Sequence, residues 1–204
     1  MSSSTRPARS HPLSSNRYTG VAIGLHWLIA IGVIAQIPMG LIMSDLPLGQ
    51  SKFALFQLHK SVGLTILALS IVRVLWRLGH KPPPLPQAMP VWQKRISGLT
   101  HLAFYAFILI TPLLGWAIVS ASPIRIPTLL WGAIPIPHLS ILTDLPMDQR
   151  KGVAGTFSEA HELMSWLGTA LIALHVGAAL KHQFLDRDGV LGRMVPFLSK
   201  PAQD

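Results

Sequence analysis

The chain has 204 residues, of which half are apolar and only 12% are charged, and its mean hydropathy is +0.46. This composition excludes an ordinary soluble domain and indicates an integral membrane protein. The net charge of +9 does not indicate nucleic-acid binding, because the basic residues stand singly near the ends of apolar runs. The absence of cysteine excludes disulfides, iron-sulfur clusters and covalent c-type haem attachment. Any cofactor must therefore be held by histidine, methionine or oxygen ligands.

Four apolar runs are long enough to cross a bilayer core of roughly 30 Å as helices. A Ser-, Pro- and Arg-rich stretch, residues 1–18, comes first and is typical of a disordered tail. Within a transmembrane domain of residues 19–184, we expect spans at about 20–43, 53–78, 96–120 and 160–183. The prolines of residues 82–86 predict a stiff linker. Ala121 to Phe157 is expected to be a loop, with at most a short surface helix, and residues 185–204 a polar tail.

The distribution of Lys and Arg predicts the orientation in the membrane. Twelve of these 17 residues lie in or beside the two terminal segments and the connection between the second and third spans, and five lie on the other side. The positive-inside rule therefore places both termini in the cytoplasm. The predicted fold is all-α, an integral membrane four-helix bundle.

The last span carries two histidines on one face. His161 and His175 are fourteen residues apart, which separates them by roughly 21 Å along a helix with an angular offset of only about 40°. Gly168 lies midway between them on the same face and leaves a gap into which a flat group could pack. A single histidine in an apolar helix is more often structural than a ligand. Partners at matching depths on other helices would favour the ligand interpretation.

Such partners are present on the first two spans. His26 lies early in the first span, level with His175 near the cytoplasmic surface, and His59 lies early in the second, level with His161 near the outer surface. Two histidine pairs stacked through the membrane are what two bis-histidine b haems require. The other histidines considered, His101 on the third span and His138 in the loop, are expected to be structural because neither has a depth-matched partner.

Three motifs resemble those of the bacterial cytochrome b561 family, and the resemblance covers roughly residues 17–195. The motifs are Gly24-Leu25-His26-Trp27, Leu58-His59-Lys60-Ser61-Val62-Gly63 with Arg73 and Trp76 downstream, and Ala173-Leu174-His175-Val176 with Ala179-Leu180-Lys181-His182. The resemblance implies two b haems per chain with His26, His59, His161 and His175 as the iron ligands, in a multi-pass protein of the cell inner (plasma) membrane. It also implies electron transfer between membrane quinone and a second partner. One member of the family is a superoxide oxidase that passes electrons to ubiquinone. The chain departs from the family in its longer N-terminal tail and third loop.

Several polar residues near the span ends have two interpretations. Arg73, Arg77, Lys60 and Lys181 are either snorkelling interfacial side chains or contacts for haem propionates or a quinone. His182 follows His175 by seven residues on the same face, about 10 Å nearer the cytoplasm. It is a candidate proton donor to a quinone, or alternatively a helix C-terminal cap.

Three functions from different classes remain possible on the sequence. The first is a superoxide:ubiquinone oxidoreductase, whose outer-side basic residues could attract the anion. Those residues are Lys52, Lys60, Arg125, Arg150 and Lys151. The second is the haem b anchor subunit of a larger dehydrogenase or hydrogenase-like complex. The third is a non-haem metal carrier that uses the same histidines. Membrane lipid and a quinone are the expected partners, with superoxide or another small molecule on the outer side and no nucleic acid.

Overall fold

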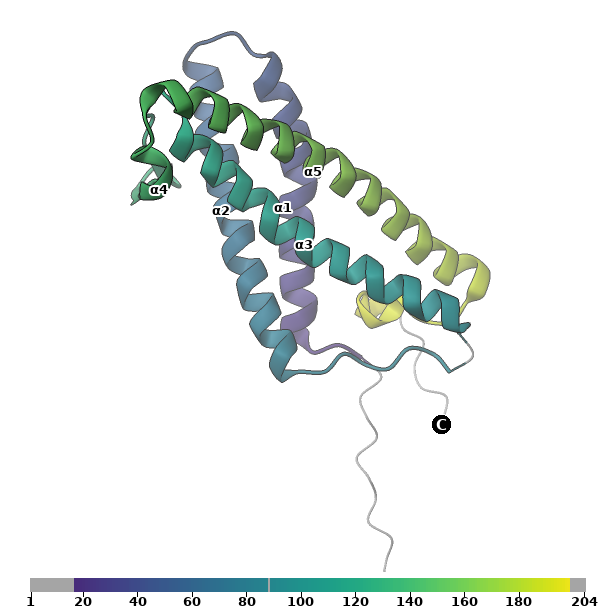
Figure 1. The fold of residues 1–204 in the computed structure, drawn as a ribbon. Coiled ribbons are helices and arrows are strands. Elements are labelled where there is room, and N and C mark those ends of the chain that lie inside the picture. Colours follow the sequence, from purple (N-terminus) through teal and green to yellow (C-terminus); the bar gives the residue numbers. More distant parts are fainter. Residues whose placement is uncertain (1–16, 88, 199–204) are drawn as a thin grey trace, which may run out of the picture.

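Four long helices make up most of the protein in a computed structural model, which describes residues 17–87 and 89–198 (Figure 1). Their bounds are Gly20–Asp45 for α1, Gln50–Gly79 for α2, Val91–Ala121 for α3 and Met147–Lys181 for α5. All four are long and apolar enough to cross a membrane. The predicted fold class, a membrane four-helix bundle, is confirmed.

The helices are arranged as two pairs. α1 packs against α2 and α3 against α5, while α2 and α3 join the two pairs, and the α3–α5 pair is inclined to the α1–α2 pair (Figure 1). The start of α1, the end of α2, the start of α3 and the end of α5 share one end of the bundle, which we call the inner end. The opposite end, which carries the α1–α2 connection and α4, is called the outer end.

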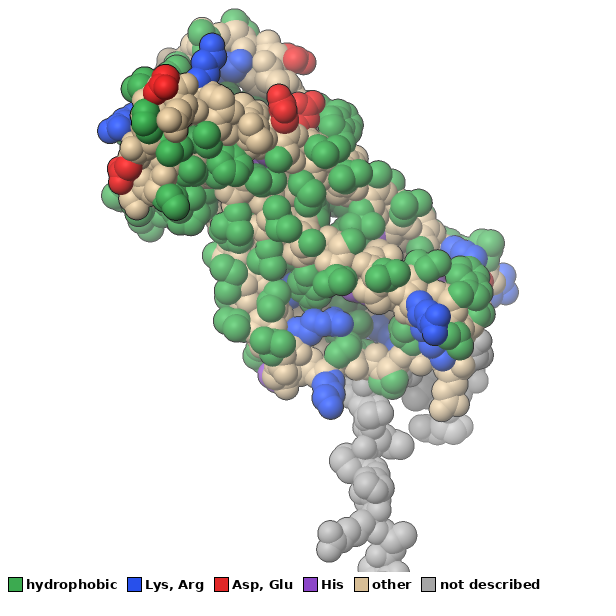
Figure 2. Space-filling model, in the orientation of Figure 1, with side chains coloured by type: hydrophobic (Ala, Val, Ile, Leu, Met, Phe, Trp, Pro, Cys, Tyr) green, Lys and Arg blue, Asp and Glu red, His purple; other side chains and the backbone are tan. Residues whose placement is uncertain are grey.

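Most of the helical surface is apolar and exposed. The buried core between the pairs is small and consists of Ile29, Ile66, Phe107 and Ile108. Figure 2 shows hydrophobic side chains along the middle of the molecule, with charged side chains gathered toward its two ends. Because a bilayer core solvates apolar but not charged side chains, this distribution fits a chain whose helices face lipid.

Glycines allow close approach between the helices. A Cβ atom added at Gly32 of α1 would lie 3.1 Å from the Ile66 side chain of α2, and one at Gly168 of α5 would overlap the Phe107 ring of α3. Small residues at such contacts are a common means of helix association in membranes. The gap expected beside Gly168 is therefore filled by the aromatic ring of Phe107.

The segment between α3 and α5 is more structured than the sequence indicates. Strands β1, Thr128–Leu130, and β2, Ile134–Ile136, form an antiparallel hairpin, and the short helix α4, Ser140–Thr143, follows. Helix α5 then begins at Met147, so the prediction of a loop as far as Phe157 is wrong for its last eleven residues. The first turns of α5 lack a span-length apolar run because they extend beyond the apolar part of the helix, and Gly152 and Gly155 further weaken the helical signal.

The described part of the C-terminal segment, for which the sequence predicts only a polar tail, contains short helical turns. A π-helical turn, His182–Asp186, is followed by 3-10 turns at Leu191–Arg193 and Pro196–Leu198. The segment returns to the start of α1, where Trp27 Nε1 donates a hydrogen bond to the Met194 carbonyl at 2.9 Å. This contact joins residues far apart in the chain, which local sequence patterns do not reveal. Most of the predicted N-terminal tail lies outside the described residues.

Candidate functional site

Two pairs of histidine rings lie between the helices, at different levels of the bundle. Toward the outer end, the ring centres of His59 on α2 and His161 on α5 are 6.1 Å apart. Toward the inner end, those of His26 on α1 and His175 on α5 are 6.4 Å apart. The structure therefore brings together the two pairs that depth matching on the sequence predicts.

The spacing of each pair fits an iron ion bound between the rings. A metal ion bonded to one nitrogen of each imidazole at about 2 Å, the usual distance in proteins, holds the ring centres about 6 Å apart. The rings of the outer and inner pairs are inclined at 65° and 68°, so neither pair is stacked face to face. Two imidazole nitrogens and an apolar surrounding are the chemistry that a b-type haem requires. Both pairs fit such a group.

The outer pair is held by backbone contacts that the sequence analysis does not identify. His161 Nδ1 lies 3.0 Å from the Thr111 carbonyl of α3 and donates to it, which leaves Nε2 as the ring atom able to bind a metal. Gln36 Nε2 of α1 donates to the His59 carbonyl at 2.9 Å. His59 Nδ1 is buried and has no hydrogen-bond partner among the described residues. In the sequence, Gln36 is noticeable only as a polar residue within the apolar first span. Nothing in the sequence indicates that the Thr111 carbonyl contacts His161.

Glycines leave space beside both outer rings. A Cβ atom at Gly115 of α3 would lie 3.4 Å from His161 Cε1, and one at Gly40 of α1 would lie 3.9 Å from His59 Cε1. Side chains longer than a methyl group at these positions would therefore crowd the rings. The two glycines therefore allow the imidazole rings to lie close to the backbones of α3 and α1.

A third imidazole joins the inner pair. The ring centre of His101 on α3 lies 6.4 Å from that of His175, as far as the His26 ring does. The expectation that His101 lacks a partner at matching depth is therefore wrong, because α3 starts at the inner end and carries His101 in its third turn. His101 Nδ1 donates to the Ser97 carbonyl at 2.7 Å, which leaves Nε2 as the ring atom able to bind a metal. The inner site consequently offers three imidazoles rather than two.

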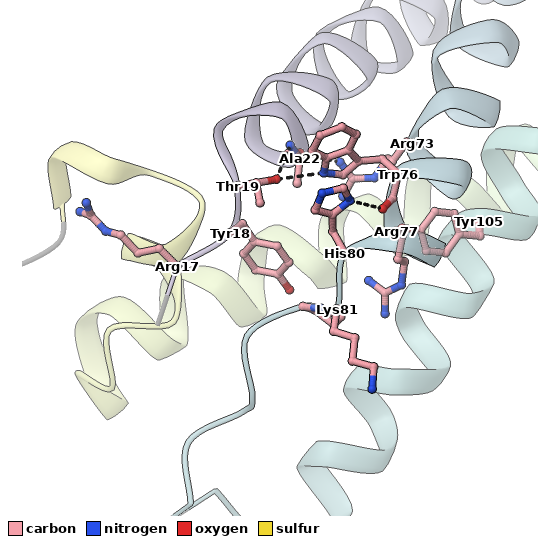
Figure 3. Close-up of a pocket in the computed structure, with 11 residues that line it drawn as sticks. Arg17, Tyr18, Thr19, Ala22, Arg73, Trp76, Arg77, His80, Lys81 and Tyr105 are labelled. Carbon is pink, nitrogen blue, oxygen red and sulfur yellow. Dashed lines mark hydrogen bonds between the residues drawn. The ribbon is translucent and has the colours of Figure 1, made fainter. Parts of the chain in front are cut away.

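Arg73 and Arg77, the predicted propionate or quinone contacts on α2, line one pocket at the inner end (Figure 3). Arg73 Nη1 donates to the Ala22 carbonyl near the start of α1 at 3.0 Å. The Arg77 guanidinium lies over the Tyr105 ring of α3, 5.6 Å from its centre. Trp76 donates to Thr19 Oγ1 at 3.0 Å and stacks on His80 at 3.9 Å. Spacing along α2 places the two arginines on one side of the helix, and the packing of α1 and α3 against α2 supplies their partners.

Lys181 and His182 are not part of this pocket. Lys181 Nζ pairs with Asp186 at 2.5 Å, and His182 Nδ1 lies 2.7 Å from an Asp188 carboxylate oxygen and 3.2 Å from Asp186. The π-helical turn at the end of α5 folds these carboxylates back onto the histidine. His182 thus lies at the same end of the bundle as Arg73 and Arg77 but outside their pocket, and it has a carboxylate partner.

Lys60, the remaining predicted contact, lies against the hairpin at the outer end. Its Nζ and the Gln57 side chain both donate to the Pro127 carbonyl, at 3.2 and 2.9 Å. The next residue, Ser61, is 2% exposed; its hydroxyl donates to the Leu129 carbonyl and accepts from the Trp131 amide. The motif that contains His59 thus also fixes the hairpin, a role that only the structure reveals.

The outer end carries no excess of positive charge. Against its five basic residues stand five acidic ones, which are Asp45, Asp144, Asp148, Glu159 and Glu162. Arg150 is only 1% exposed and donates to the carbonyls of Ser120 and Ser122 at 3.2 and 2.7 Å, so it stabilises the end of α3 rather than presenting a surface charge. Burial, and then the charges of Lys60, Arg150 and Arg125, lower the pKa of His138. Electrostatic attraction of an anion to this end is therefore weaker than expected from the basic residues alone.

Comparison with known proteins decides the family. The family model described as Prokaryotic cytochrome b561 matches residues 17–197, nearly the whole described chain. This chain belongs to that family. It is 31% identical over 182 residues to cytochrome b561 homolog 2 of Escherichia coli K12, covering 88% of this chain and 91% of the relative. Cytochrome b561 homolog 1 of the same organism is 28% identical over 182 residues, covering 89% and 98% of the two chains.

A third relative carries a more specific name. The probable superoxide oxidase CybB of Yersinia pestis is 27% identical over 184 residues, which cover 88% of this chain and 96% of the relative. Membership of the cytochrome b561 family establishes the coarse function, which is membrane electron transfer with haem b. The resemblance seen in the sequence motifs is thereby confirmed.

Proposed function

We propose that this protein is a di-haem b cytochrome of the cell inner membrane that transfers electrons between ubiquinone at the inner end and superoxide, or another small partner, at the outer end. The observation that carries the proposal is the presence of two histidine pairs at the spacing of a bis-histidine iron site, one toward each end of the bundle. Both termini lie in the cytoplasm in this proposal, because nine described basic residues lie at the inner end against two acidic ones.

The chain's own residues have distinct roles in this proposal. His59 and His161 would hold the outer haem, and His26 and His175 the inner one. When bound, the haems supply one-electron carriers at two depths. The Thr111 carbonyl fixes the orientation of His161 by accepting from its Nδ1, and Lys60 with Ser61 holds the hairpin over the outer site.

His182 is proposed to supply a proton to the quinone. Two superoxide ions would each give up one electron and become oxygen, and one quinone would take up those two electrons with two protons to become the quinol. His182 lies beyond His175 on α5, and Asp188 accepts from its Nδ1 at 2.7 Å, which favours a fixed ring orientation with Nε2 free. Arg73 and Arg77 remain candidate contacts for a propionate or the quinone because both lie at the same end.

Haem quantification tests the proposal directly. We expect the purified protein to contain two low-spin b haems per chain, and the reduced protein not to bind carbon monoxide, because two histidines would hold each iron. A reduced-minus-oxidised spectrum combined with a haem and protein assay measures this. One haem per chain, or full carbon monoxide binding, would contradict the pairing, and the absence of a Soret band would favour the metal-carrier alternative.

The outer partner is tested separately. Superoxide should reduce the haems of the oxidised protein, and added ubiquinone should reoxidise them. Because acidic and basic residues are equal in number at the outer end, we expect the rate to change by less than about twofold between low and high salt. A haem-loaded protein that superoxide does not reduce, purified together with a large partner, would instead favour the anchor-subunit alternative.

A further inference from the structure

The pocket at the inner end is lined by cations and aromatic rings. Its basic side chains are Arg17, Arg73, Arg77 and Lys81, and none of its lining residues is Asp or Glu. The two described carboxylates at this end, Asp186 and Asp188, pair with Lys181 and His182 instead. The positive charge of the pocket is therefore not neutralised by a described acidic residue that lines it, and an anion is the ligand that this environment favours.

Two of these cations are available to a ligand. Arg73 already donates to the Ala22 carbonyl, but Arg77 and Lys81 are exposed and donate no hydrogen bond to any residue in the described ranges. In Figure 3 the Tyr18 hydroxyl, the Arg77 guanidinium and the Lys81 side chain all point downward in this view, with Arg77 over the Tyr105 ring of α3. Three donors directed to one side suit the several oxygens of a phosphate group.

Exposed apolar side chains are also present on α2 and α3 toward this end of the bundle. Leu75 and Leu78 of α2 are 61% and 78% exposed, and Leu102 of α3 is 66% exposed. Tyr18, Trp76 and Tyr105 line the pocket itself, and such amphipathic rings favour the boundary between the headgroups and the acyl chains. A ligand that fits this surface has an anionic head and apolar tails. A neutral quinone lacks the charge, and free phosphate lacks the tails.

We propose that the inner pocket binds the phosphate of an anionic phospholipid, with Arg77 and Lys81 as its main contacts and the acyl chains along α2 and α3. A basic pocket between transmembrane helices is a recognised means of binding such headgroups. The bound lipid would neutralise the pocket and fasten the end of α2 to the start of α1 and to α3. This inference concerns a lipid site and does not require that the quinone or superoxide proposals hold.

Native mass spectrometry of the haem-loaded protein tests the site with three probes, which are phosphatidylglycerol, phosphatidylcholine and inorganic phosphate. The pocket variant is Arg77→Gln with Lys81→Gln. The control variant, Lys94→Gln with Arg95→Gln, removes the same charge from the start of α3, outside the pocket lining. Each basic contact to an anionic lipid contributes about 1 kcal/mol, so the pocket variant should bind phosphatidylglycerol roughly tenfold to thirtyfold more weakly. The control should stay within about threefold of the wild type.

Four results would contradict the proposal. Equal weakening in both double variants would show a general charge effect, and unchanged binding in the pocket variant would remove the site. Equal binding of phosphatidylcholine, or displacement of phosphatidylglycerol by inorganic phosphate at similar concentration, would show that an anionic lipid is not the ligand. If the pocket variant loses haem, Lys81→Gln alone carries the test, because this exposed side chain is outside the candidate haem contacts; it should still weaken phosphatidylglycerol binding severalfold.

Discussion

The two ends of the bundle differ in both charge and architecture. At the inner end lie nine basic and two acidic described residues, and four of the basic residues line a pocket without an acidic one. At the outer end, acidic and basic residues are equal in number, and the chain adds a hairpin, α4 and the start of α5 there. The inner end is thus suited to anionic groups, and the outer end has no comparable excess of charge.

This difference shows that net charge is a poor guide to the site of anion binding. The charge of +9 is concentrated at the end that the positive-inside rule assigns to the cytoplasm. At the outer end, the most buried basic side chain, Arg150, is used to bind the carbonyls at the end of α3. If the two ends act independently, a substitution at one end should leave the haem and the reactions at the other end unchanged.

Removal of one iron ligand at each end should have separate consequences. We expect His59→Ala to remove the outer haem and His26→Ala the inner haem, so that the haem content falls from two per chain to one in each variant. The matched control is His101→Ala, which removes an imidazole equally near His175 and should leave both haems bound. Loss of the inner haem from His101→Ala, with retention in His26→Ala, would make His101 the axial ligand.

Quinone reduction should depend on the inner end alone. His182→Ala should lower the rate of quinone reduction by about 100-fold, the lower end of the usual contribution of a general acid, while both haems stay bound and are still reduced by dithionite. His138→Ala, which removes an imidazole at the outer end, is the control and should leave the rate unchanged. If quinone turnover survives in His182→Ala, the residue acts only as the cap of α5.

The stability of the outer segment should depend on Arg150. Arg150→Met removes two hydrogen bonds from a charged donor, each of which contributes about 1.5–3 kcal/mol. The desolvation cost of the buried charge is removed as well. We expect a net destabilisation of about 2 kcal/mol, seen as faster hydrogen exchange in residues 122–146. Lys151→Met, at an exposed neighbour, should not change exchange. An equal rate in both variants would show that Arg150 does not hold the segment.

The smallest expected effect is the pH dependence of the same segment. Because burial and nearby cations lower the pKa of His138, the unfolded segment takes up a proton on this ring more readily than the folded one. The stabilisation is therefore complete above the unfolded pKa of about 6.5 and decreases as the pH falls below it. Hydrogen exchange, corrected for its intrinsic pH dependence, should show this loss in the wild type and less of it in His138→Gln. A matching loss in both proteins would assign it to other groups.

The sequence by itself determined the class of the fold and the two principal histidine pairs. Helix periodicity and length are local properties, so the four spans and the shared face of His161 and His175 follow from spacing alone. Depth in the membrane follows from chain direction, which matched His26 with His175 and His59 with His161. The same depth matching also places His101 near the level of His175, because the third span begins at the inner end. The information needed for the third imidazole was therefore present in the sequence.

Only the tertiary structure decided which helix residues the connecting and C-terminal segments contact. Ser61 contacts Leu129, Arg150 contacts Ser120, and Trp27 contacts Met194, each across a long separation in sequence. Such hydrogen bonds satisfy backbone groups that have no helical partner, and no local pattern reports which distant residue will supply the partner. The grouping of Arg73 and Arg77 with the start of α1 and with Tyr105, and the separation of His182 from them, likewise depend on how the helix pairs cross. Packing between helices sets these positions, and spacing along one helix does not determine them.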